Sequence, residues 1–436
     1  MTRFRYSGLI SLLLLASVFK LGAQVKEAEL VGQGLHALTE VLINDITSPP
    51  VASRDYVYPL IAFYEVARNA DTSYRSYAGQ LIGLSSVPAP LKDEQYDWVV
   101  AGATAFYKTA YAFVFSKEMF KQSWSMIDAE LKKRKISPAI FERSVQYGQQ
   151  VADHIVLWAK GDNYGHTRTL PRFTPDTKPG AWKQTGPDYM EAVEPNWRQI
   201  RPMTLSKPDL FTIPGPVAFS SEEFKKECQE VYKVGNTLTA KQKAIANFWD
   251  CNPFATQTVG HMMYSVKKVS PAGHWIGITG VAIRQKKLNL VQALQAYTLV
   301  SVAIFDVIIS SWDEKYRSNY IRPVTAIQQS ISPTWQPLLQ TPPFPEYPSG
   351  HSVISNASAV ILTGIFGDNF HYTDDVEKPF GLPARSFTSF FAAADEAAIS
   401  RLYGGIHFRE AIENGKLMGK MVGEYVFRTV QLKVIR

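Results

Sequence analysis

The sequence predicts an all-α protein made of long amphipathic helices. Over most of the chain, apolar residues recur every three to four positions, which is the spacing of a buried helix face. Pro and Gly cluster in residues 161–216, where no helical period survives, and this marks a long connection between two sets of helices. Of the 436 residues, 46% are hydrophobic and 19% are charged, so the composition indicates a globular fold and excludes a disordered chain.

Residues 1–23 are expected to be a signal peptide. Arg3 and Arg5 precede an apolar stretch, residues 9–19, that is too short to span a bilayer, and small residues at positions 22–23 permit cleavage. Export to the periplasm or the medium is therefore expected. Cleavage removes three of the 46 basic residues and none of the 39 acidic ones, so the formal net charge falls from +7 to +4. A charge this mild gives no support to a nucleic-acid or membrane-surface partner.

Residues 24–220 are expected to form an N-terminal helical region. Ser137 and Pro138 fit a helix N-cap and first turn. The connection at 161–216 is expected to be ordered and to cover the helices near the mouth of the active site. Helical spacing is predicted over residues 26–46, 54–81, 92–115, 117–134 and 138–160.

Residues 221–436 are expected to form a C-terminal helical region that carries the functional site. The helix at 289–320 is apolar on nearly every side, which indicates a central helix. Gln292, Gln295 and Asp306 within it argue against membrane insertion. The other helices are predicted over residues 221–234, 239–249, 352–366, 387–403 and 407–429.

Cys228 and Cys251 are the only cysteines in the chain. In an exported protein they are compatible with one disulfide, and equally with two buried thiols. Neither lies in a CxxC pair or in a spacing typical of zinc ligands.

The segment Pro348-Ser349-Gly350-His351 joins a proline-rich run, residues 341–347, to the helix at 352–366. Free backbone N–H groups and the helix dipole favour an anion at such a point. Gly350 has no Cβ, so an oxyanion can approach its N–H, and Ser349 and His351 add a hydroxyl and an imidazole. Taken alone, the same four residues also fit a capped helix with a histidine in its first turn.

Two further segments supply three cations and a second histidine. Lys315 and Arg322 are seven residues apart, so they share a helix face if the helix continues to Pro323, which would end or bend it. Arg401 and His407 flank a pair of glycines that can direct both side chains toward one point. Together with the 348–351 segment, these groups predict a site for a tetrahedral oxyanion, with the arginines donating forked hydrogen bonds.

These three blocks resemble the signature of the vanadium-dependent haloperoxidase and type 2 phosphatidic acid phosphatase superfamily. The blocks occur in the superfamily's order, at residues 315–323, 348–351 and 400–407. The resemblance implies two packed helical bundles with the site in the C-terminal bundle. It also implies vanadate as the cofactor, at a site that phosphate can occupy as well.

Residue roles follow from the resemblance. It implies that His407 bonds the central atom, as the vanadium ligand in haloperoxidases and as the nucleophile in phosphatases, and that His351 is the general acid–base. It implies that Lys315 also activates hydrogen peroxide. The residues implied to hold the anion are Lys315, Arg322, Ser349, Gly350 and Arg401.

Three functions remain open at this point. The first is a haloperoxidase that oxidises halide with hydrogen peroxide to hypohalous acid. The second is an exported acid phosphatase acting on soluble phosphomonoesters through a phosphohistidine, and the third is an oxyanion-binding protein without activity. A homo-oligomer is compatible with each of them.

The chain departs from the superfamily pattern at Ala411, where an aspartate would accept the proton of the far nitrogen of His407. Glu410 lies on nearly the same helix face, so we expect Glu410 or a backbone carbonyl to take this role, with Glu413 as a further option.

Three more residues complete the expected site. Trp312 and Phe344 match aromatic positions that line the halide pocket of haloperoxidases, where a phenylalanine resembles chloride-oxidising members; packing in the core is the alternative. Asp306 is expected to pair with Arg401, because a buried acid needs a partner.

Overall fold

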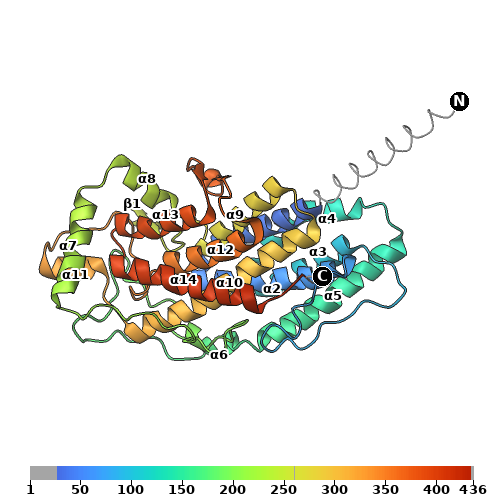
Figure 1. Ribbon diagram of the computed structural model, residues 1–436, viewed down its shortest axis with the longest axis horizontal. Coiled ribbons are helices and arrows are strands. Elements are labelled where there is room, and N and C mark those ends of the chain that lie inside the picture. Colours follow the sequence, from blue (N-terminus) through green and yellow to red (C-terminus); the bar gives the residue numbers. More distant parts are fainter. Residues whose placement is uncertain (1–26, 260, 434–436) are drawn as a thin grey trace.

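The computed structural model describes residues 27–259 and 261–433 (Figure 1). The expected signal peptide, residues 1–23, lies outside the described residues. The described chain is all-α, as predicted, with two short antiparallel hairpins added. Both cysteines are buried free thiols.

The N-terminal helices agree with the prediction best where a capping residue marks their start. Ser137 caps α5, which has the predicted bounds. The predicted helix at 54–81 is displaced: Ser48 caps its start, prolines fill its first turn, and it ends at Ala67. The elements are a helix over 27–44, α2 (Pro49–Ala67), η1 (Arg68–Ala70), α3 (Trp98–Phe113), α4 (Lys117–Lys132), α5 (Pro138–Lys160), α6 (Tyr164–Thr167) and η2 (Trp197–Gln199).

The C-terminal half contains two helices, α9 and α11, and two hairpins that the sequence did not predict. The helices are α7 (Glu222–Asn236), α8 (Ala240–Phe248), α9 (Pro271–Lys286), α10 (Leu290–Ser318), α11 (Pro323–Ser330), α12 (Gly350–Phe366), η3 (Lys378–Phe380), α13 (Phe390–Tyr403) and α14 (Arg409–Thr429). The hairpins pair β1 (Thr256–Val259) with β2 (Met262–Ser265) and β3 (Tyr372–Asp374) with β4 (Arg385–Phe387).

Helix α10 is the centre of the fold, as its apolar sequence predicted. It lies beside α12 and α14 along the long axis of the molecule, and α2 and α9 also pack against it (Figure 1). Among the described helices, α10 is the one that is long and apolar enough to cross a membrane by composition, and 94% of its most apolar window is buried inside the fold. One hydrophobic core runs from Ala28 to Leu432 and joins both halves of the chain.

Three glycines on α14 bring its backbone against α12. Gly415, Gly419 and Gly423 are four residues apart and so lie on one helix face. A Cβ added at Gly419 would come within 2.5 Å of the Val353 carbonyl oxygen, and one at Gly423 within 2.9 Å of the Ala357 carbonyl oxygen. The two helices are therefore in backbone contact, close to the N-terminus of α12.

The connection at 161–216 is ordered, and part of it lies against α10 and the proline-rich run. The carbonyl of Val193 accepts hydrogen bonds from Trp312 Nε1 at 3.2 Å and from the Tyr316 hydroxyl at 2.6 Å. The Val193 N–H donates to the Pro343 carbonyl at 3.0 Å. The connection therefore supports residues that surround the site.

Replacing Asp55 by asparagine is expected to stabilise the fold at alkaline pH. Asp55 lies on α2 with 4% of its surface exposed, and burial raises its pKa to about 7. In the unfolded chain an aspartate pKa is about 4. The folded state therefore holds this proton more tightly, so wild-type stability falls as the pH rises from about 4 to about 7 and stays low above that range.

Asparagine carries no charge at any of these pH values, so the free energy of unfolding of D55N does not fall in this way. In the wild type the fall is roughly 2–4 kcal/mol at pH 8. Urea unfolding of both proteins at pH 4 and pH 8 measures it. The gain from D55N should be several times larger at pH 8, and an equal effect at the two pH values would contradict the prediction.

Candidate active site

One cavity gathers six of the residues that the sequence singled out. They come from the end of α10, the proline-rich run, the start of α12, the end of α13 and the turn before α14. The six are Trp312, Phe344, Gly350, His351, Arg401 and His407. Residues 251–253, Pro49 and Pro271 form part of the remaining wall.

The N-terminus of α12 faces this cavity. Ser349 is fully buried and is the N-cap, with its Oγ accepting from the Ser352 N–H at 3.4 Å. A Cβ added at Gly350 would meet no atom within 4 Å, so open space lies in front of this residue. His351 follows in the first turn, and its buried Nε2 has no partner among the described residues.

Lys315 and Arg322 do not share one continuous helix, so the condition under which they would share a helix face is not met. Helix α10 ends at Ser318 because Asn319 adopts a left-handed conformation with φ 47°. Arg322 is then the N-cap of α11, with Pro323 in its first turn. Both side chains nevertheless reach the loop that precedes α12.

The ammonium group of Lys315 is bound to the loop before α12. Its Nζ donates to the carbonyls of Pro345 at 3.0 Å, Glu346 at 3.1 Å and Pro348 at 2.5 Å. These bonds use all three ammonium protons. In this structure Lys315 holds the proline-rich loop in place and acts on the cavity through its charge.

The two arginines are held by carbonyl oxygens. Arg322 donates through Nε to Phe344 and through Nη1 to Ile406, both at 2.9 Å, while its buried Nη2 has no partner among the described residues. Arg401 donates through Nη2 to the carbonyl of Trp249 at 2.7 Å. Carbonyl oxygens fix both guanidinium groups without cancelling their charge.

Lys315, Arg322 and Arg401 are each at most 1% exposed. Across the described part of the chain, none of the three forms a salt bridge with a carboxylate. A buried charge without a counter-ion is costly. The arrangement is therefore suited to a bound anion that supplies the missing negative charge.

His407 is fixed in one tautomer by its two neighbours. Arg322 Nη1 lies 3.2 Å from His407 Nε2, and an arginine can only donate, so Nε2 carries a lone pair. The proton is then on Nδ1, which donates to Glu346 Oε1 at 2.8 Å. Glu346 Oε1 also accepts from the Phe408 N–H at 2.9 Å.

Glu346 therefore takes the role that we expected of Glu410, and that expectation is wrong. Glu410 Oε2 accepts from the Val217 N–H at 2.9 Å, and Glu413 pairs with Lys416 at 3.2 Å. The helix-face argument failed because His407 lies in the turn before α14, outside the helix that carries both glutamates. The sequence signal for Glu346 was an acid within an apolar, proline-rich run directly before the 348–351 segment.

Burial and neighbouring cations keep both site histidines neutral at neutral pH. Burial lowers the pKa of His407 well below its usual value, and the charges of Arg322 and Lys315 lower it further. Burial and Arg401 lower the pKa of His351 in the same direction. Burial raises the pKa of Glu346 to about 8, and Arg322 opposes this shift. Both imidazoles can therefore accept a proton or serve as ligands.

Trp312 and Phe344 form an aromatic wall of the cavity, with ring centroids 5.2 Å apart. The Phe344 ring also lies under two cations, 5.1 Å from Lys315 Nζ and 5.0 Å from the Arg322 guanidinium. The two rings are buried and therefore combine core packing with a position at the site.

Asp306 does not pair with Arg401, so this expectation is also wrong. Its carboxylate accepts from the Met203 N–H at 2.6 Å and from the N–H and hydroxyl of Thr204 at 2.8 and 2.6 Å. The acid in the central helix therefore anchors the long connection. The sequence carries no local signal for these partners, because two of the three donors are backbone N–H groups and all three lie about a hundred residues away.

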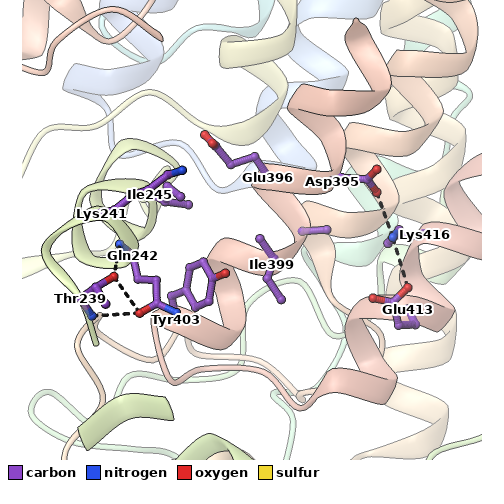
Figure 2. Close-up of a pocket in the computed structure, with 11 residues that line it drawn as sticks. Thr239, Lys241, Gln242, Ile245, Asp395, Glu396, Ile399, Tyr403, Glu413 and Lys416 are labelled. Carbon is purple, nitrogen blue, oxygen red and sulfur yellow. Dashed lines mark hydrogen bonds and ion pairs between the residues drawn. The ribbon is translucent and has the colours of Figure 1, made fainter. Parts of the chain in front are cut away.

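A second hollow, on the surface between α8, α13 and α14, is separate from this site. Figure 2 shows Lys416 between Asp395, at 2.9 Å, and Glu413, at 3.2 Å. The hollow shares no lining residue with the cavity that contains the two histidines. Three of its charged groups, Asp395, Glu413 and Lys416, pair with one another, and none of them reaches the anion site.

Comparisons with known proteins agree with this geometry. The family model of the second helical-bundle domain of VCPO matches residues 295–435, which contain all three sequence blocks. A search of curated proteins found no significant match.

Solved structures give matches over nearly the whole chain. A bacterial vanadium-dependent iodoperoxidase is 44% identical, with a TM-score of 0.88, over 94% of this chain and 98% of that one. The apo form of a bacterial vanadium-dependent chloroperoxidase is 17% identical, with a TM-score of 0.67, over 88% and 94% of the two chains. Its holo form gives a TM-score of 0.64 at the same identity, over 88% and 93% of the chains, so these two matches show a shared fold.

Proposed function

The chain belongs to the vanadium-dependent haloperoxidase family, and from this premise we propose that it is an iodoperoxidase, which oxidises iodide with hydrogen peroxide. The family assignment makes it a peroxidase with vanadate as its cofactor and with peroxide and halide as substrates. Support for iodide is the 44% identity to a bacterial iodoperoxidase across 98% of that chain. The observation that carries the function is the set of three buried cations that have no carboxylate partner within residues 27–259 and 261–433.

The residues present fit vanadate. Arg322 Nη2 is a buried donor that none of the described residues satisfies, and the space in front of Gly350 leaves the N-terminus of α12 open to an anion. Arg322, Arg401 and the Gly350 N–H would hold its oxygens, and the lone pair on His407 Nε2 would bind the metal. Bound vanadate supplies a Lewis acid that activates hydrogen peroxide without a change in oxidation state.

The protein's own groups provide the rest of the chemistry. Glu346 holds the proton of His407 on Nδ1, so Nε2 is kept available as a ligand. His351 is neutral at neutral pH and has a free Nε2, so it can accept a proton from hydrogen peroxide that enters the cavity and later return it. The cations stabilise the negative charge that appears when this proton leaves.

The aromatic wall limits what reaches the site. Trp312 and Phe344 close one side of the cavity with apolar faces, and the nearby cations attract an anion. A monatomic halide satisfies both conditions. A large phosphomonoester would have to place its organic group against this wall.

We also propose that the protein acts outside the cytoplasm. The n-region, apolar stretch and small residues of positions 1–23 support cleavage and export. An exported enzyme would release its oxidised halide away from the cell's own thiols and cofactors.

A paired assay tests the function. The protein is recovered from the periplasm and medium, stripped of anions and assayed with and without orthovanadate. One arm follows peroxide-dependent oxidation of iodide, bromide and chloride, and the other follows hydrolysis of p-nitrophenyl phosphate. We expect vanadate to switch on iodide oxidation, with bromide and chloride oxidised much more slowly.

Each arm has an outcome that contradicts the proposal. Phosphate release that vanadate inhibits, without halide oxidation, would make the protein a phosphatase. Equal rates with bromide and iodide would overturn the iodide assignment while leaving the family activity intact. Recovery from the cytoplasm alone would contradict export.

A further inference from the structure

A second cluster of potential ligands lies in the interior, next to the cavity of the anion site. Cys251 follows α8, His274 lies in the first turn of α9, and Glu377 lies between β3 and β4. His274 Nδ1 is 3.4 Å from Cys251 Sγ and 3.1 Å from Glu377 Oε1, and Sγ and Oε1 are 3.8 Å apart. All three residues are buried. A thiol, an imidazole and a carboxylate thus turn their donor atoms toward one point.

These separations match a tetrahedral zinc site. With Zn–S near 2.3 Å and Zn–N and Zn–O near 2.0–2.2 Å, tetrahedral angles place donor atoms about 3.4–3.6 Å apart. The observed distances of 3.1, 3.4 and 3.8 Å straddle that range. The donor set is also that of zinc, which accepts thiolate, imidazole and carboxylate together.

The surroundings of His274 resemble those of a histidine ligand. Its other ring nitrogen, Nε2, lies 2.8 Å from Asp374 Oδ2, and neither side chain is exposed. A metal-bound histidine almost always donates its second N–H to such an acceptor, which fixes the ring and its tautomer. The indole of Trp249 stacks on the imidazole with the centroids 4.7 Å apart, and this leaves the ring plane no freedom to turn.

We propose that Cys251, His274 and Glu377 bind one zinc ion, with Asp374 orienting His274 and a water or the second Glu377 oxygen in the fourth position. The site shares no ligand with the anion site. The ligands come from three distant segments, so no zinc-like spacing appears in the sequence. The thiolate and the Glu377 carboxylate would neutralise the two charges of the ion.

Such an ion would stiffen one wall of the catalytic cavity. Cys251 itself lines that cavity, and the carbonyl of Trp249, two residues earlier, accepts a hydrogen bond from Arg401. Zinc would tie this segment to α9 and to the β3–β4 hairpin. Its role would therefore be to keep an anion-binding arginine in position, without contact with the reacting atoms.

The alternative is a metal-free cluster in which a protonated His274 donates to both Asp374 and Glu377. Elemental analysis of the purified protein, as isolated and after equilibration with zinc and removal of the excess, separates the two. We expect close to one zinc per chain in the wild type. Cys251→Ser should lose it, and Asp374→Asn should bind it roughly 10- to 100-fold more weakly.

Cys228→Ser is the matched control. Cys228 is as buried as Cys251, at 2% exposed, but lies in α7 and takes no part in the cluster. It should retain the zinc. A wild type that holds no more zinc than Cys251→Ser, or equal loss in Cys228→Ser, would overturn the proposal.

A spectroscopic test keeps the proposal falsifiable if Cys251→Ser fails to fold. Cobalt(II) bound to the wild type through a thiolate should show a sulfur-to-metal charge-transfer band and tetrahedral d–d bands. The bands should be present in Cys228→Ser. Octahedral cobalt without the charge-transfer band in the wild type would exclude ligation by Cys251.

Discussion

His407→Ala is expected to abolish vanadate-dependent iodide oxidation, with a loss on the order of 10³-fold or more, as for other essential catalytic residues. The Nε2 atom of His407 carries a lone pair, and contacts with Glu346 and Arg322 fix the orientation of the imidazole ring at the anion site. Alanine leaves the cations to hold vanadate by hydrogen bonds alone. Vanadate titration followed by calorimetry should therefore show much weaker binding together with the lost rate.

His36→Ala is the control for this variant. The His36 side chain is 67% exposed on the first helix and does not line the cavity. Its loss should therefore leave the rate of iodide oxidation and the affinity for vanadate at the wild-type level. Thermal unfolding of the His407 variant should remain cooperative. Wild-type affinity for vanadate in a folded His407→Ala would show that His407 is not the ligand.

Glu346→Ala is expected to weaken vanadate binding roughly 10- to 100-fold, the usual cost of losing the group that orients a metal ligand. Alanine leaves His407 Nδ1 and the Phe408 N–H without their shared acceptor. Vanadate affinity and iodide oxidation at saturating vanadate should be measured separately. Glu346→Gln retains an acceptor oxygen of similar shape and should recover part of the affinity.

Glu410→Gln is the matched control, since it changes the glutamate that the sequence favoured. Its carboxylate contacts the Val217 N–H and not the histidine, so we expect vanadate affinity within about twofold of wild type, as for other substitutions away from the site. If Glu410→Gln lost affinity while Glu346→Ala kept it, the assignment of Glu346 would be wrong.

Several helix starts were predictable from local capping signals. Ser137, Thr239 and Asn289 each mark a helix start within one residue of the predicted one, because capping is decided by the residues of one turn. Helices α9 and α11 and the two hairpins were not predicted, although Ser270 and Pro271 give α9 the same N-cap and first turn that Ser137 and Pro138 give α5. The displaced α2 shows that an apolar period alone does not define where a helix stops.

The residues of the site also fall into those that local sequence signals predicted and those that they did not. The blocks around Lys315, His351 and His407 identified an anion site because each carries its chemistry in adjacent residues. The acid that contacts His407 was predicted among residues of the helix that follows it. It comes instead from the loop before α12, which also carries the 348–351 segment. Two of the three donors to Asp306 are backbone N–H groups, which no residue type identifies, and the third is a hydroxyl 102 residues away.

The backbone contact between α12 and α14 has a consequence for how the enzyme tolerates sequence change. Side chains between two helices can adjust their rotamers to absorb a substitution, but Gly419 and Gly423 meet carbonyl oxygens directly. Any larger residue at these positions must displace α12 as a rigid body, and with it residues 349–351 at its N-terminus. Variation at these glycines, which never touch the anion, should therefore be as restricted as variation in the catalytic blocks themselves.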